Sequence, residues 1–143
     1  AIDGKPLDSV VCLNVVEHIE DDVGTLENLY RILKPGGAAI ILVPHDPKLY
    51  TAVDKTLGHY RRYTKKTLSE AMERAGFEVE KCWGFNRLGG IGWRVSGKVL
   101  GKKTLSPGQM RTFEYLMPVA RLLEKFPVHS HNSVIAVGRK PKD

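Results

Sequence analysis

Two short apolar runs flank an amphipathic segment near the start of the chain. Residues 9–16 form a nearly continuous apolar run rich in β-branched side chains, which is typical of a strand buried on both faces of a parallel sheet. Residues 21–34 place apolar side chains at helical spacing between opening acids and closing bases, as the helix dipole favours. A turn at Pro35-Gly36-Gly37 and an apolar run at 38–43, which Pro44 ends, predict a second strand. Together these segments predict a βαβ unit.

The pattern beyond this unit predicts one more helix and two more strands around an insert. Thr64 or Thr67 can cap a helix that ends at Gly76. Strands are expected at 78–85 and, as the closing strand, at 133–138.

The segment at about 86–126 is expected to be a helical insert or a cover over a substrate pocket. Its glycines at 89, 90 and 92 do not follow a strand with the spacing of a dinucleotide-binding turn. The sequence Ser106-Pro107-Gly108-Gln109 has the spacing of a capping box, and an apolar stripe continues from it to residue 123. Pro118 lies inside this stripe and predicts a kink or a break in the helix.

The composition bounds the size and class of the protein. A chain of 143 residues is long enough for one compact domain, and 42% hydrophobic with 27% charged residues predicts a soluble globular protein. No apolar stretch approaches the ~20 residues that span a bilayer, and the first five residues lack the features of a secretory signal. Cys12 and Cys82 lack the spacing of a disulfide framework, so we expect reduced thiols in a cytoplasmic protein.

The charge of the chain is positive and unevenly distributed. Lys and Arg number 22 against 16 Asp and Glu, a net charge of +6, and residues 55–66 are basic whereas 3–27 are acid-rich. The run from His59 to Lys66 interleaves aromatic and basic side chains, and Lys65 falls in the first turn of a predicted helix, where a cation opposes the dipole. A substrate or lid role, a solvated surface and a nucleic-acid site are all open for this loop, and nucleic acid is the least favoured.

The sequence gives little sign of a metal site. His129-Ser130-His131 places two imidazoles at i and i+2, but no cysteine or carboxylate lies near them in the sequence. We interpret this segment as a surface loop and expect no metal.

Three motifs follow one another in a specific order. Leu13-Asn14-Val15-Val16-Glu17-His18 ends the first strand, and Leu33-Lys34-Pro35-Gly36-Gly37 leads into the second. His59-Tyr60-Arg61-Arg62-Tyr63-Thr64 follows, and then Ala75-Gly76-Phe77. In this order they resemble the second half of a class I S-adenosylmethionine-dependent methyltransferase. The similarity is strong up to about Phe77 and weak beyond it.

This resemblance implies a fold and a boundary. It implies an α/β, Rossmann-like methyltransferase sheet of which residues 1–143 form the second half, with strands four to seven and their flanking helices. The N-terminal half, with the family's glycine-rich turn and the acid that holds the ribose, is absent from these residues. The missing first strand would lie beside residues 9–16, so we expect either a fragment of a longer enzyme or self-association through this bare strand.

The resemblance also implies site residues, which open α/β sheets place at the carboxyl ends of their strands. The candidates for binding S-adenosylmethionine are Leu13, Asn14, Val15 and Glu17. The candidate catalytic bases are His18 and His59. The candidates for substrate binding are Tyr60, Arg61, Arg62 and Tyr63. A purely structural role for Glu17 and His18, at a strand-to-helix corner, stays open beside these assignments.

The implied activity is methyl transfer from S-adenosylmethionine to an O, N or C nucleophile. The basic residues and the apolar cover are compatible with a small-molecule, lipid-linked or glycan acceptor. The sequence does not identify which of these it is. The alternative is a non-catalytic interaction module derived from a methyltransferase, which would bind a partner through the bare strand or the basic loop.

Overall fold

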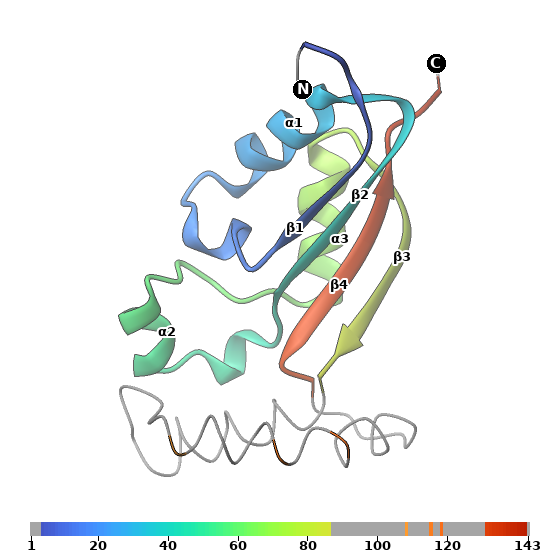
Figure 1. The fold of residues 1–143 in the computed structure, drawn as a ribbon. Coiled ribbons are helices and arrows are strands. Elements are labelled where there is room, and N and C mark those ends of the chain that lie inside the picture. Colours follow the sequence, from blue (N-terminus) through green and yellow to red (C-terminus); the bar gives the residue numbers. More distant parts are fainter. Residues whose placement is uncertain (1–3, 87–107, 109–114, 116–117, 119–130, 143) are drawn as a thin grey trace.

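Four strands form one mixed sheet. A computed structural model describes residues 4–86, 108, 115, 118 and 131–142 of the chain. The strands are β1 (Leu7–Leu13), β2 (Leu33–Pro44), β3 (Glu78–Phe85) and β4 (Ser133–Arg139), in the spatial order β1-β2-β4-β3 (Figure 1). β1 runs parallel to β2, and β4 is antiparallel to both of its neighbours. The expected α/β class and the parallel first pair are confirmed.

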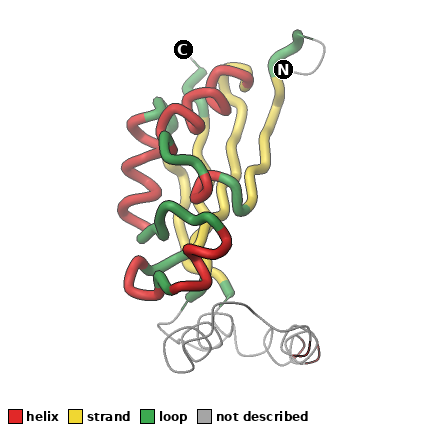
Figure 2. The backbone as a smooth tube through the Cα atoms, turned by 90° about the vertical axis from the view of Figure 1, so that its left-hand side faces the viewer, coloured by secondary structure: helices red, strands yellow, loops and turns green. Residues whose placement is uncertain are grey.

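The helices of the described residues lie on one face of this sheet, as Figure 2 shows. They are α1 (Asp22–Ile32), α2 (Ala52–Leu57), α3 (Lys65–Arg74) and the 3-10 turns η1 (Val16–His18) and η2 (Pro47–Leu49). Thr64 caps α3 by accepting a hydrogen bond from the backbone N–H of Thr67 at 3.0 Å, so the first of the two predicted caps is confirmed.

The core lies between the two long helices and the covered face of the sheet. Leu26 of α1 and Leu68 and Met72 of α3 are fully buried, in one cluster with Ile41 and Ala136 of the sheet. Burying a side chain of this size stabilises the fold by roughly 1.5–3 kcal/mol. This packing holds both long helices against the sheet.

The opposite face of the sheet is open among the described residues. The large apolar side chains exposed there are Val11 (58%), Leu13 (51%), Trp83 (40%) and Phe85 (45%). The expectation that the first strand is buried on both faces is therefore wrong, because helices cover only the face on which Cys12 lies. β1 is also the edge strand of the sheet, as expected.

Three element boundaries differ from the sequence-based expectation. The first strand ends at Leu13 because Asn14 adopts a left-handed backbone, with φ of 52°, and the chain then enters η1. Helix α1 ends at Ile32, and β2 already begins at Leu33. The Pro35-Gly36-Gly37 turn is therefore an irregularity within β2, where Gly36 takes a φ of 78° that favours glycine.

Some predicted features have other outcomes. The sequence pattern predicts no helix between Pro44 and Thr64, but the structure places η2 and α2 there. A capping box starts α2, with Thr51 and Asp54 bonded to each other's backbone N–H groups. The glycines at 89–92 and most of the predicted helix after Ser106 lie outside the described residues.

No helix among the described residues has both the length and the apolar character needed to cross a membrane.

Candidate functional site

The corner after β1 exposes three of the four predicted cofactor-binding residues. Leu13 and Val15 are about half exposed, at 51% and 44%. Asn14 lies between them, and its backbone N–H donates to the carbonyl oxygen of Leu42 at 2.9 Å, which fixes the turn against β2. The corner therefore lies at the carboxyl ends of the two parallel strands, where open α/β sheets bind ligands.

Glu17, the fourth predicted residue, is fully buried in η1. Neither carboxylate oxygen has a hydrogen-bond partner among the described residues. Burial raises the pKa of this carboxyl above its usual value, although the nearby His59, His18 and Arg62 act in the opposite direction. An unpartnered buried carboxylate is costly, so its presence calls for a physical explanation.

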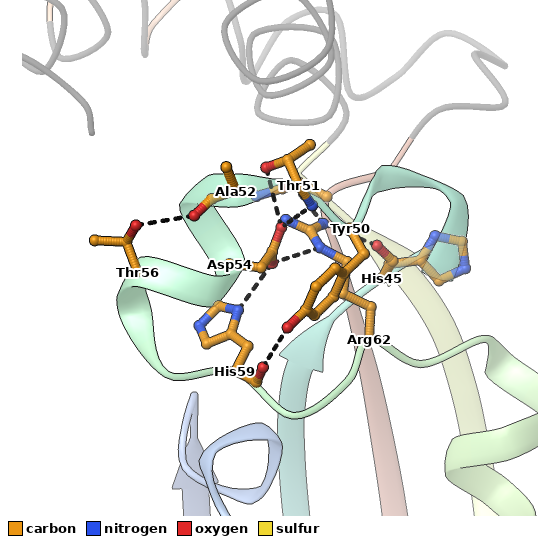
Figure 3. Close-up of polar contacts among 9 residues, drawn as sticks. His45, Tyr50, Thr51, Ala52, Asp54, Thr56, His59 and Arg62 are labelled. Atoms are coloured by element: carbon orange, nitrogen blue, oxygen red, sulfur yellow. Dashed lines mark hydrogen bonds and ion pairs between the residues drawn. The ribbon is translucent and has the colours of Figure 1, made fainter. Parts of the chain in front are cut away.

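A buried carboxylate, Asp54 of α2, organises the second wall of the site (Figure 3). Its oxygens accept hydrogen bonds from the backbone N–H of Thr51 at 2.8 Å, from Arg62 Nε at 2.7 Å and from His59 Nδ1 at 2.9 Å. Burial alone would raise the pKa of Asp54, but the hydrogen bonds from Arg62 and His59 hold it below its usual value. Asp54 is therefore an ionised acceptor that fixes both of these side chains.

The corner and this second wall meet through the backbone and through two rings. The backbone N–H of Tyr60 donates to the carbonyl oxygen of Glu17 at 2.8 Å. The rings of His18 and His59 lie edge to face, with their centroids 4.7 Å apart. The structure thus brings together both predicted bases and Glu17.

These residues open on a cavity of about 400 Å³. Its lining includes Asn14, Glu17, His18, Leu57, His59 and Arg62. The cavity joins the corner of the sheet to the loop after α2, two segments separated by about 40 residues of sequence.

The four predicted substrate-binding residues are divided between different environments. Tyr60 is exposed at 55%, whereas Arg62 is buried and lines the cavity. Arg61 forms an ion pair with Asp22 at 2.9 Å, and the buried Tyr63 donates its hydroxyl hydrogen to the same carboxylate at 2.8 Å. Arg61 and Tyr63 therefore hold the loop against the start of α1, and substrate binding by all four residues stays a prediction.

Asp54 is the site residue that the sequence reasoning missed. The Thr51-x-x-Asp54 spacing is a capping-box signal that predicts a helix start at this place. The further bonds of Asp54 to residues five and eight positions later carry no comparable local signal. The grouping of Glu17 and His18 with His59 was missed as well, because it depends on the tertiary fold.

We expect Asp54→Asn to lower the free energy of unfolding by about 3 kcal/mol or more, because it removes the carboxylate with which the buried Arg62 is paired. Asp8→Asn is the matched control. Asp8 pairs with Lys34 at 2.6 Å with its side chain 87% exposed, so this change should cost less than about 1 kcal/mol. Urea unfolding at pH 7 measures both, and equal losses would contradict the prediction.

We expect Glu17→Gln to stabilise the chain at neutral pH in a buffer that contains EDTA. A carboxyl whose pKa is raised on folding holds its proton more tightly in the folded state, so wild-type stability falls as the pH rises above its usual pKa of 4.5. Glutamine does not titrate. The difference in free energy of unfolding between variant and wild type should therefore grow from pH 4 to pH 7, and a constant difference would contradict this account.

Comparison with known proteins assigns the chain to a family. A family model described as a methyltransferase domain matches residues 3–81, which is more than half of the chain. A protein of Mycolicibacterium smegmatis, named a probable S-adenosylmethionine-dependent methyltransferase, is 34% identical over 80 residues. The match covers 54% of this chain and 31% of that protein, so this chain spans about a third of its relative.

Solved structures share the fold. Phosphoethanolamine N-methyltransferase 2 of Haemonchus contortus, in complex with S-adenosyl-L-methionine, is similar with a TM-score of 0.55 and 20% identity over 94% of this chain and 33% of its own. A SAM-dependent methyltransferase from Archaeoglobus fulgidus has a TM-score of 0.55 and 20% identity over 95% of this chain and 60% of its own. At these identities the likeness concerns the fold alone. The family match confirms the resemblance seen in the motifs: the chain belongs to the methyltransferase domain family.

Proposed function

We propose that this chain forms part of a methyltransferase that uses S-adenosylmethionine to methylate an O, N or C nucleophile. The observation that carries the proposal is the position of the Glu17, His18 and His59 cluster in a cavity at the carboxyl end of the parallel strands. The family match and the cofactor named for two neighbours of the same fold support it. The acceptor in this proposal is a small-molecule, lipid-linked or glycan compound.

The residues that would hold the cofactor are those of the corner after β1. Leu13 and Val15 offer exposed apolar side chains, and the left-handed turn at Asn14 presents main-chain groups beside them. This chemistry fits the amino-acid part of the cofactor, which combines polar and apolar groups. When bound, S-adenosylmethionine supplies the electrophilic methyl group.

His59 is positioned to accept a proton from the methyl acceptor. Asp54 is ionised and can only accept hydrogen bonds, so the nitrogen that faces it, Nδ1 of His59, carries the hydrogen. In the neutral ring the lone pair then lies on Nε2, which can take a proton from an acceptor hydroxyl or amine. Positioning and exclusion of water are expected to contribute most to such a displacement.

The charge of the chain supports an anionic acceptor. Within the cavity, Arg62 is buried and paired with Asp54, so its position is fixed before any ligand binds. The net charge of +6 favours the approach of the same class of compound.

Calorimetric titration with S-adenosylhomocysteine tests this function directly, because the product binds without turning over. We expect saturable binding when the strands that complete the sheet are present, either in a longer parent chain or in an added N-terminal half. The matched variants are Val15→Lys, which places a charge in the corner, and Phe85→Lys, which alters an equally exposed apolar residue in β3, away from the corner. Weaker binding for Val15→Lys alone is the expected result.

Failure to bind S-adenosylhomocysteine under these conditions would contradict the proposal. It would favour the non-catalytic interaction module, which would bind a partner through the bare strand β1 or the basic loop.

The second part of the proposal concerns strand pairing at the open edge of β1. β1 pairs only with β2 among the described strands, and Val11 and Leu13 are exposed beside this edge. An unpaired strand edge with apolar neighbours readily accepts another strand. We propose that a strand of a longer parent chain, or of a second copy, pairs here.

Light scattering with thermal melting checks this pairing on the 143-residue chain. Because another copy can pair with β1 in such a preparation, we expect dimers or larger species whose melting temperature rises with protein concentration. A monodisperse monomer that melts cooperatively would contradict the proposal.

A further inference from the structure

We propose that Glu17, His18 and His59 form a binding site for a divalent first-row transition metal. One potential ligand atom from each residue lies within 4.8 Å of those from the other two. A carboxylate and two imidazoles are a common ligand set for such ions, and it leaves further coordination positions open.

The backbone holds the three donors together before any ion binds. Glu17 and His18 are neighbours in η1, and His59 arrives from the loop after α2. The hydrogen bond from the Tyr60 N–H to the Glu17 carbonyl oxygen, at 2.8 Å, ties the two segments at this point.

The buried carboxylate of Glu17 is the strongest single indication. The side chain is 0% exposed, and neither oxygen has a hydrogen-bond partner among the described residues. Leaving such a group unpaired is costly, whereas a cation in contact with it offsets the loss of hydration. Asp54 already compensates the neighbouring Arg62 charge at 2.7 Å, so Glu17 is available as the anionic ligand.

His59 has the orientation expected of a metal ligand. Its Nδ1 faces the Asp54 carboxylate at 2.9 Å, which leaves the lone pair of Nε2 for coordination. Histidines that bind metals almost always donate their other ring hydrogen in this way, often to a carboxylate. His18 lies edge to face with His59, and it is the more exposed of the two rings.

The ion would change how the acceptor is activated, a role that rests on the proposed function. Its open coordination positions would adjoin the cavity of about 400 Å³ that the three ligands line. An acceptor hydroxyl bound there would have a lowered pKa and would release its proton to water, which would leave an oxygen nucleophile. His59 then acts as a ligand through the same lone pair that would otherwise take the proton. Metal binding itself does not depend on methyl transfer.

Titration of the untagged full chain with Co²⁺ and Zn²⁺ tests the site. We expect one Co²⁺ to bind per chain with new visible absorption bands, and an excess of Zn²⁺, whose d shell is filled, to abolish these bands by replacing it. Glu17→Gln and His18→Gln should each weaken binding at least about 10-fold, the lower end of the loss seen when even an outer partner of a ligand is removed. His18 is exposed, so its variant is expected to fold.

Two control variants separate this site from others on the chain. Glu20→Gln removes an exposed carboxylate three residues from Glu17 and should leave the affinity unchanged. His131→Gln tests the His129-Ser130-His131 pair as a rival site. Absence of saturable binding, or weakening by His131→Gln without weakening by Glu17→Gln and His18→Gln, would overturn the proposal.

Titration with S-adenosylhomocysteine, after an N-terminal half that completes the sheet has been added to the same samples, distinguishes the two proposals. A chain that binds S-adenosylhomocysteine but no Co²⁺ or Zn²⁺ refutes the metal site and leaves the proposed function standing. A chain that binds the ion with the expected dependence on Glu17 and His18, but no S-adenosylhomocysteine, supports the metal site and contradicts the proposed function.

Discussion

The buried Asp54 carboxylate is the interaction on which the arrangement of the cavity depends. It accepts hydrogen bonds from the start of its own helix, from His59 and from Arg62. Arg62 in turn donates to the carbonyl oxygen of His45, just after β2, and to the Asn132 side chain, just before β4. One carboxylate therefore fixes a short helix, a loop and the ends of two strands. Because the group is excluded from water, these bonds are stronger than they would be at the surface.

This network also explains how a loop far along the sequence reaches the corner after β1. The parallel strands bring their carboxyl ends to the same edge of the sheet, and α2 projects from the end of β2. The loop that follows is held from both sides, by Asp54 and by the ion pair of Arg61 with Asp22. His59 is thereby placed against His18, although each is positioned by a different segment.

The sequence was informative where the signal is local. Apolar runs and caps predicted the four strands and both long helices, and the motif order indicated the family. The predicted boundaries were wrong where one residue departs from the regular backbone, as at Asn14. The prediction that the first strand is buried on both faces was wrong because an apolar run does not reveal which of its faces another layer covers. The bonds of Asp54 to residues five and eight positions later, and the cluster around Glu17, which joins segments about 40 residues apart, depend on contacts that neither periodicity nor spacing encodes.

The strand order has a consequence for the sequence of events during synthesis. β3 pairs only with β4 among the described strands, and β4 is made last, from residues 133–139. Residues 78–85 must therefore wait, with Trp83 and Phe85 unpaired, until residues 133–139 have left the ribosome. Only then can β4 enter between β2 and β3. A protein built in this way is exposed to misassociation during translation until β4 is in place.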